Sequence, residues 1–144
     1  MNAPPDPVRR QPRGVVAVAA RDGRYLAIRR GATVAAGGRI CFPGGHVEAG
    51  EEERTAVERE CREELGVTVE ATVQVWSSVT TWGTALSWWT VRLVGDDDLV
   101  PHPVEVAEIL WLSEEEMLAD PDLLPGNRDF LLAVRDGTIR LELP

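Results

Sequence analysis

Residues 45–67 read GHVEAGEEERTAVERECREELGV, and they contain the clearest helical pattern in the chain. Apolar residues recur there about once per helical turn, at Ala56, Val57, Cys61 and Leu65. This recurrence is typical of a helix with one buried face. Gly66 follows at the position where a glycine commonly ends a helix. We therefore predict a helix over residues 52–65 that is entered from a glycine-containing loop.

Three glutamates of this helix have the spacing i, i+3 and i+4, namely Glu60, Glu63 and Glu64. Side chains at this spacing share one helix face, and like charges there cost roughly 0.2–0.5 kcal/mol per pair. One compensation is ion pairing at i, i+4 spacing, for which the available pairs are Glu58–Arg62 and Arg59–Glu63. The other is a divalent cation such as Mg²⁺, which prefers oxygen ligands. Helix geometry alone leaves both alternatives open.

Length and composition predict one soluble domain. The chain has 144 residues, of which 44% are hydrophobic and 27% charged, enough for a core of its own. A net charge of −9 argues against binding nucleic acid polymers or membranes through bulk charge. The chain has no apolar run long enough for a membrane span and no signal-peptide pattern, and Cys41 and Cys61 have no metal-site spacing. We expect a cytoplasmic protein, monomeric or homodimeric, with buried reduced thiols.

The N-terminal residues 1–13 are rich in proline and arginine, so we expect a flexible tail before a single domain over residues 14–144. Two strand-like runs, residues 14–20 and 21–30, meet at a turn centred on Asp22-Gly23. An Asp-Gly pair between apolar runs is a strong hairpin signal.

The rest of the chain continues the same alternation of elements. Ser113 and Glu116 form a capping box that opens a short helix. We expect strands over residues 67–82, 84–94 and 106–113, and helices over residues 114–120 and 127–135. Strands on both sides of one central helix predict an α/β layered domain with a mixed sheet.

The fixed positions of residues 45–67 resemble the Nudix box, G-x5-E-x7-R-E-U-x-E-E-x-G-U, in which U is apolar. Every position is filled, by Gly45, Glu51, Arg59, Glu60, Cys61, Glu63, Glu64, Gly66 and Val67. Cys61 is the least typical of these residues, and the preceding FPGG also matches many members. The chain is identified as similar to the Nudix hydrolase superfamily and its MutT-like members. The resemblance implies a Nudix-type α/β/α sandwich with a mixed β-sheet and a loop–helix–loop catalytic motif.

Nudix domains hydrolyse a nucleoside diphosphate linked to another moiety, using Mg²⁺ or Mn²⁺. The resemblance implies that the metal is bound by Glu60, Glu63, Glu64 and the carbonyl oxygen of Gly44. It also implies that Arg59 pairs with Glu51 to hold the loop and helix in shape. The chemistry agrees, because a cation neutralises phosphate charge while a carboxylate accepts the proton of the attacking water.

Four residues outside the box are further candidates. Glu105 stands six residues before Trp111, where MutT-like members carry an additional metal-binding or base glutamate, and Glu108 is its competitor. Arg30 ends a strand at the position where these proteins contact the substrate through an arginine. Asn127 matches a base-reading asparagine, although it could equally be the N-cap of the last helix.

The tryptophans are a second possible source of base contacts, by stacking. Trp88 and Trp89 are adjacent in a strand and must face opposite sides, so one of them is expected in the core. The other tryptophan of this pair is then a candidate for stacking on a base. Trp82, at the break between the two long strands, is the further candidate for substrate contact.

Sequence markers of NADH pyrophosphatases, ADP-ribose hydrolases, diadenosine polyphosphate hydrolases and coenzyme A hydrolases are absent. By elimination we expect a nucleoside triphosphate, oxidised nucleotides included, to be cleaved to a monophosphate and pyrophosphate. The alternatives are a Nudix hydrolase of sugar nucleotides or dinucleotides, and a noncatalytic nucleotide-binding sensor.

Overall fold

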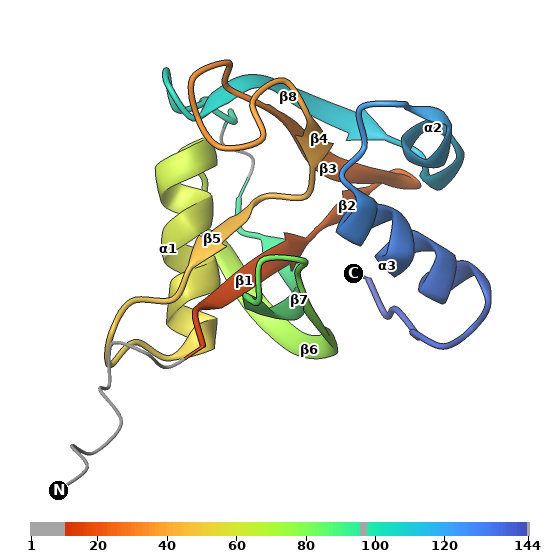
Figure 1. Ribbon diagram of the computed structural model, residues 1–144. Coiled ribbons are helices and arrows are strands. Elements are labelled where there is room, and N and C mark those ends of the chain that lie inside the picture. Colours follow the sequence, from red (N-terminus) through yellow and green to blue (C-terminus); the bar gives the residue numbers. More distant parts are fainter. Residues whose placement is uncertain (1–10, 96–97, 144) are drawn as a thin grey trace, which may run out of the picture.

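The computed structural model describes residues 11–95 and 98–143, which form the strands and helices labelled in Figure 1. In chain order they are β1 (Arg13–Val18), β2 (Ala20–Arg21), β3 (Arg24–Arg30), β4 (Ile40–Cys41), β5 (Gly44–His46), α1 (Glu53–Leu65), β6 (Val69–Val79), β7 (Ala85–Leu93), β8 (Val106–Leu112), α2 (Glu114–Ala119) and α3 (Pro125–Arg135). Most of the tail expected at residues 1–13 lies outside the described residues, and Arg13 already belongs to β1. None of the described helices is both long and apolar enough to cross a membrane.

The strands form two four-stranded sheets. In the first, with the order β5-β1-β7-β6, β1 runs parallel to β7 and the other pairs are antiparallel, so the expected mixed sheet is confirmed. The second sheet is antiparallel, with β8 along one edge of β3 and the short strands β2 and β4 along the other. Its β2–β3 connection is the hairpin predicted at Asp22-Gly23, and both turn residues have positive φ.

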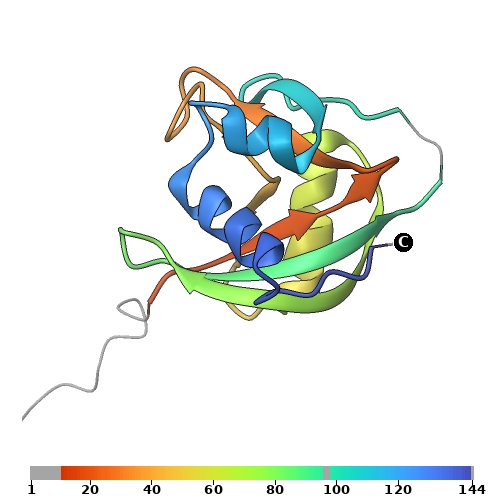
Figure 2. The same cartoon turned by 90° about the vertical axis from the view of Figure 1, so that its right-hand side faces the viewer.

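Helices cover both faces of the first sheet: in Figure 2, α3 lies in front of its strands and α1 lies behind them. Successive residues of a strand face opposite sides. Val15 of β1 packs in the core cluster that contains the apolar face of α1, whereas Val16 packs with Trp88 and with Phe130 of α3 on the other side. The predicted α/β/α arrangement is therefore confirmed, and Trp88 is the tryptophan of the pair that belongs to the core.

Helix α1 begins at Glu53 and ends at Leu65, within one residue of the prediction. Gly66 has the left-handed φ of 61° expected of a helix-ending glycine. The prediction of an ion pair between Glu58 and Arg62 was wrong. Glu58 Oε2 instead accepts a hydrogen bond of 3.0 Å from the amide of Ala71 in β6. This partner lies in a strand, so the spacing of residues along the helix could not predict it.

The two C-terminal helices differ in how well their starts were predicted. Ser113 and Glu116 form the expected capping box of α2. Helix α3 begins at Pro125, two residues earlier than predicted, and its N-cap is Leu124. Proline suits the first helical position because its missing N–H would have no helical partner there. The N-cap role considered for Asn127 is therefore wrong, and its side chain is free for another contact.

Candidate active site

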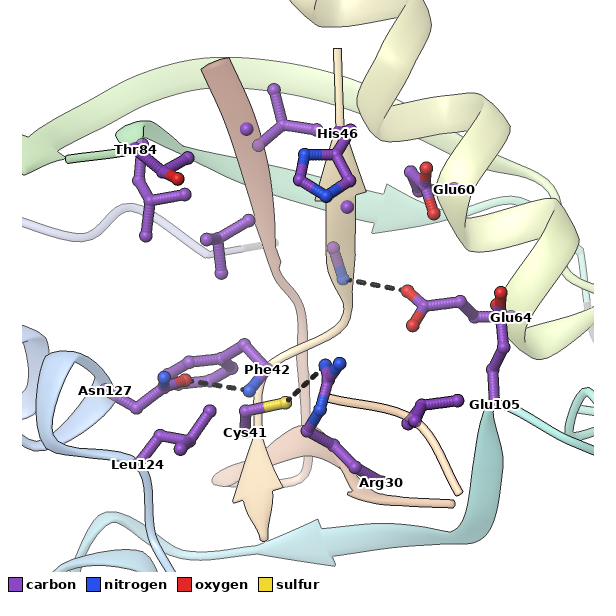
Figure 3. Close-up of a pocket in the computed structure, with 17 residues that line it drawn as sticks. Arg30, Cys41, Phe42, His46, Glu60, Glu64, Thr84, Glu105, Leu124 and Asn127 are labelled. Carbon is purple, nitrogen blue, oxygen red and sulfur yellow. Dashed lines mark hydrogen bonds between the residues drawn. The ribbon is translucent and has the colours of Figure 1, made fainter. Parts of the chain in front are cut away.

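A pocket of about 340 Å³ opens between helix α1, the end of β3 and the start of α3. Figure 3 shows Glu60, Glu64 and Glu105 along one side of this pocket and Leu124 and Asn127 on the opposite side. The first side is acidic and the second mainly apolar. One cavity thus joins residues that lie far apart in the sequence, from Gly14 to Asn127.

Glu64 is the most deeply buried of the acidic residues that line the pocket, with 4% of its surface exposed. Its Oε1 accepts a hydrogen bond of 2.9 Å from the amide of Gly44, the strand residue predicted to sit at the metal site. Burial raises the pKa of this carboxyl to about 8, helped by the charges of Glu60 and Glu105, although the Gly44 amide and Arg30 act in the opposite direction. A cation near Glu64 would relieve this penalty.

Glu60 lies one helical turn before Glu64 and faces the same pocket. Burial raises its pKa to about 6, with contributions from Glu63 and Glu105, while the guanidinium of Arg59 lowers it. Its carboxylate packs directly on the backbone of Gly45, where a Cβ would collide with it. A side chain at position 45 would push the Glu60 carboxylate out of this position, so the glycine of the box leaves room for it.

Arg59 connects the loop before α1 to the helix. Its Nε and Nη2 donate to the two carboxylate oxygens of Glu51 at 2.8 and 2.9 Å, and Nη2 also donates to the carbonyl oxygen of His46 at 2.9 Å. The predicted Arg59–Glu51 pair is present. Hydrogen bonds from Arg59 lower the pKa of Glu51 to about 2.

Glu63 is placed differently from the two glutamates in the pocket. Its carboxylate accepts a hydrogen bond of 3.1 Å from Nη1 of Arg59, its side chain is 51% exposed, and it does not line the pocket. The predicted i, i+4 pair of Arg59 with Glu63 is therefore present. Glu63 is about 100° around the helix from Glu64, which turns it toward solvent.

Glu105 reaches the pocket from the loop that precedes β8. Its competitor Glu108 does not line the pocket and instead pairs with Arg29, with Oε1 at 3.2 Å from Nε. The difference follows from their positions, because Glu105 precedes the strand while Glu108 lies within β8 beside β3. Of the two glutamates, only Glu105 lies with Glu60 and Glu64.

Arg30 is the one arginine or lysine among the described residues that line the pocket. Its Nε donates to the carbonyl oxygen of Ala35 at 2.7 Å, which ties the β3–β4 loop to the pocket wall. Its Nη1 lies 3.9 Å from Sγ of Cys41. Burial raises the pKa of the Cys41 thiol to about 11, so this residue faces the site as a neutral group.

Asn127 is buried opposite the acidic side, and its Oδ1 accepts a hydrogen bond of 2.8 Å from the amide of Phe42. Because the Phe42 amide can only donate, the oxygen of Asn127 must face it, which leaves the NH₂ group for a ligand. The structure brings neither tryptophan candidate to the pocket: Trp89 packs against the core cluster that contains the apolar face of α1, and Trp82 is 90% exposed in the β6–β7 turn. The physical reason is that this turn extends beyond the sheet.

Several lining residues were not found from the sequence: Phe42, His46, Thr84, Leu86 and Leu124. The apolar members look like ordinary core residues in the sequence, and the box leaves the His46 position unspecified. Only the proximity of β5, β7 and the start of α3 brings them together.

The acidic side suits a hard divalent cation by its chemistry, since it consists of carboxylate oxygens that repel one another. Among residues 11–95 and 98–143, no three His, Cys, Asp or Glu side chains already lie close enough together to hold an ion. Arg59 Nη1 supplies the nearby positive charge, 3.0 Å from Oε1 of Glu60. The carboxylate oxygens on the acidic side therefore fit a cation. In this structure the guanidinium of Arg59 lies beside the Glu60 carboxylate.

Comparison with known proteins agrees with these features. A family model described as the NUDIX domain matches residues 8–134. The solution structure of the E. coli ORF135 protein is 33% identical, with a TM-score of 0.74 over 93% of this chain and 97% of that one. The MutT protein of Methanosarcina mazei Go1 is 26% identical, with a TM-score of 0.74 over 88% and 94% of the two chains.

A third similar structure is the MutT NUDIX hydrolase of Burkholderia pseudomallei, which is 28% identical with a TM-score of 0.71 over 85% of this chain and 97% of that one. No curated protein matches the chain. The domain match, the complete box and the carboxylates gathered in one pocket lead to the same conclusion: this chain belongs to the Nudix family and is a MutT-like Nudix hydrolase.

Proposed function

We propose that this hydrolase cleaves a nucleoside triphosphate, oxidised nucleotides included, to a nucleoside monophosphate and pyrophosphate with Mg²⁺ or Mn²⁺. The observation that supports the proposal best is the division of one pocket into two chemically different sides. Glu60, Glu64 and Glu105 suit a metal-bound phosphate chain, whereas Asn127 and Leu124 suit a nucleobase. A nucleotide has the same division between a charged and a flat, largely apolar end.

The residues that would hold the cation are Glu60, Glu64 and Glu105, with Glu63 beside them on the helix and the carbonyl of Gly44 in the adjacent strand. When bound, a divalent cation neutralises the negative charge of the phosphate oxygens and makes water a better nucleophile. Arg30 would contribute a second positive charge that binds and orients the phosphates.

The reaction also needs a group that accepts the proton of the attacking water. Glu105 is our first candidate because it lines the pocket from a different segment than the helix glutamates. A box glutamate is the alternative. Arg59 and Glu51 act in this proposal as the clamp that keeps the loop and helix in register.

At the opposite side, the NH₂ group of Asn127 would donate a hydrogen bond to an acceptor on the base. Its Oδ1 is already bound to the amide of Phe42, so Asn127 would recognise an acceptor more readily than a donor. We propose further that the protein acts in the cytoplasm, as a monomer or homodimer. We propose that it has no nucleic acid polymer or membrane partner, consistent with its net charge of −9.

Fold alone does not select the substrate, because a Streptococcus suis protein described as an ADP-ribose pyrophosphatase shares it, with a TM-score of 0.71 at 18% identity. The test is a panel of nucleoside triphosphates, oxidised triphosphates, sugar nucleotides and dinucleotides, incubated with Mg²⁺ or Mn²⁺ and analysed by mass. We expect a nucleoside monophosphate and pyrophosphate from a triphosphate.

Preferential cleavage of a sugar nucleotide or dinucleotide would replace the proposed substrate class. Nucleotide binding without hydrolysis of any member would instead indicate a sensor. A Glu64→Gln protein serves as the control for contaminating hydrolases, since any activity that survives this change at the wild-type rate does not come from the described pocket.

A further inference from the structure

The loop that carries Glu105 into the pocket is closed around the imidazole of His102. Nδ1 of His102 accepts hydrogen bonds from the amides of Val104 and Glu105, both at 3.1 Å. Two amides donating to one nitrogen require that Nδ1 carry no proton and present its lone pair. The imidazole thus plays the part that an Asn or Asp side chain plays in a tight turn.

The backbone of His102 makes a second connection, to the helix on the other side of the acidic cluster. Its amide donates to the carbonyl oxygen of Glu64 at 2.9 Å, and its own carbonyl oxygen accepts from Val106 at 3.1 Å. One residue therefore bonds to the backbone of both Glu64 and Glu105, two acids that lie far apart in the sequence and side by side in the pocket.

The Glu105 backbone is also held from the opposite direction. Its carbonyl oxygen accepts a hydrogen bond of 2.9 Å from the amide of Gly31, where a Cβ would collide with the carbonyl of Val104. His102 itself stands between Pro101 and Pro103, and a residue before proline is restricted to extended conformations. The backbone at Glu105 therefore has few alternative conformations, and it sets the direction of the Glu105 side chain. His102 Nδ1 is the side-chain atom that accepts hydrogen bonds from this backbone.

We infer that His102 is a positioning residue for the metal site, which holds Glu105 at a set distance from Glu64. The inference rests on the proposed role of Glu105 in cation binding. A carboxylate ligand whose backbone is fixed loses less conformational freedom when it binds an ion. Removing the Nδ1 acceptor frees two amides and allows Glu105 to leave the pocket.

A pair of amide variants separates this role from general packing. In His102→Asn, Oδ1 stands at the same number of bonds from the backbone as Nδ1, so it can accept the same two hydrogen bonds. In His102→Gln the acceptor is one bond farther away, at the position of the imidazole Nε2. The two variants have the same functional group and differ in where they place it.

The measurements use the full chain. Binding of Mn²⁺ alone is measured by the loss of the free-ion signal in electron paramagnetic resonance, and kcat and KM are measured for the best nucleotide of the panel. We expect His102→Gln to weaken Mn²⁺ binding by about 10-fold and to lower kcat more than it changes KM. His102→Asn should stay within about 3-fold of the wild type, as expected if only the acceptor position matters. A well-folded His102→Asn protein with the 10-fold loss would overturn the inference.

A double-mutant cycle shows whether His102 acts through Glu105. In a Glu105→Ala background, His102→Gln should have little further effect on Mn²⁺ binding. An equal loss in both backgrounds contradicts the inference. If Glu105→Ala alone changes neither Mn²⁺ binding nor kcat, the proposed role of Glu105 is wrong and the inference with it. If Glu105→Ala weakens binding but the two His102 variants behave alike, only the role of His102 is wrong.

Discussion

Arg59 binds both carboxylate oxygens of Glu51, through Nε at 2.8 Å and Nη2 at 2.9 Å. The same guanidinium contacts Glu60 at 3.0 Å through Nη1. Because guanidinium is planar and rigid, its orientation toward Glu51 also determines how it meets Glu60. The scaffold pair and the acidic side of the pocket are thus coupled through one side chain.

The Glu51–Arg59 pair should make the protein sensitive to acid. The pKa of Glu51 is lowered to about 2 from an ordinary value of 4.5, so between these values the unfolded chain binds more protons. The free energy of unfolding therefore falls as the pH drops from about 4.5 toward 2. Urea denaturation over this pH range should show a smaller decline in the free energy of unfolding for Glu51→Gln than for the wild type. Glu52→Gln, an exposed neighbour, should decline like the wild type.

Glu64 should make the free energy of unfolding fall as the pH rises, which is the opposite direction from Glu51. Its pKa is raised from 4.5 to about 8, so the native protein binds more protons than the unfolded chain between these values. In the presence of EDTA, the free energy of unfolding should fall as pH rises from about 5 to 8. The Glu64→Gln protein should show a smaller decline and be more stable than the wild type at pH 8. Glu63→Gln, which changes an exposed side chain, should show the same decline as the wild type. A wild-type curve without decline would contradict the burial of a charged Glu64.

Position in the pocket should rank the glutamates in catalysis. Glu64→Gln removes a buried carboxylate that faces the cavity, and we expect kcat to fall about 100-fold or more. Glu63→Gln changes an exposed carboxylate that contacts Arg59, so the loss should be smaller. Steady-state rates at saturating Mg²⁺ check the order, with melting temperatures to confirm folding. Equal losses would mean that Glu63 is as important to the site as Glu64.

Asn127 should contribute to both stability and substrate binding. Asn127→Ala leaves the Phe42 amide without its partner, which should cost about 1–3 kcal/mol of unfolding free energy. Asn127→Asp keeps an acceptor for that amide but has no NH₂ group. A folded Asn127→Asp protein should therefore show a raised KM for the nucleotide. An unchanged KM would exclude the proposed contact with the base.

Trp88 and Trp82 should differ in their contribution to stability, because one is buried and the other is exposed. Trp88 is fully buried and stacks on Phe130 with a centroid distance of 4.5 Å, and its Nε1 donates to Ser78 at 2.9 Å. Trp88→Ala should cost about 3–5 kcal/mol of unfolding free energy. Trp82→Ala, at a side chain that is 90% exposed, should change it by less than about 0.5 kcal/mol. A large loss for Trp82→Ala would show that the turn packs against something in solution.

The sequence by itself determined the features that depend on neighbours within a few residues. The span of α1, its end at Gly66 and the capping box of α2 all depend on short-range spacing, and all three are present. The Glu51–Arg59 pair was likewise foreseen, from the resemblance of the box. These features were predictable because helix periodicity and turn geometry are set by the local backbone.

Tertiary structure alone decided which side chains enter the pocket. Glu64 is buried while Glu63 is exposed, Glu58 binds a β6 amide, and Asn127 binds the Phe42 amide. The contact of His102 with the Glu105 loop belongs to the same group. A buried polar group takes whichever partner the packing of distant segments brings within reach, because leaving it unpaired costs more than any local preference. Local spacing carries no information about those segments, so these contacts could only be read from the fold.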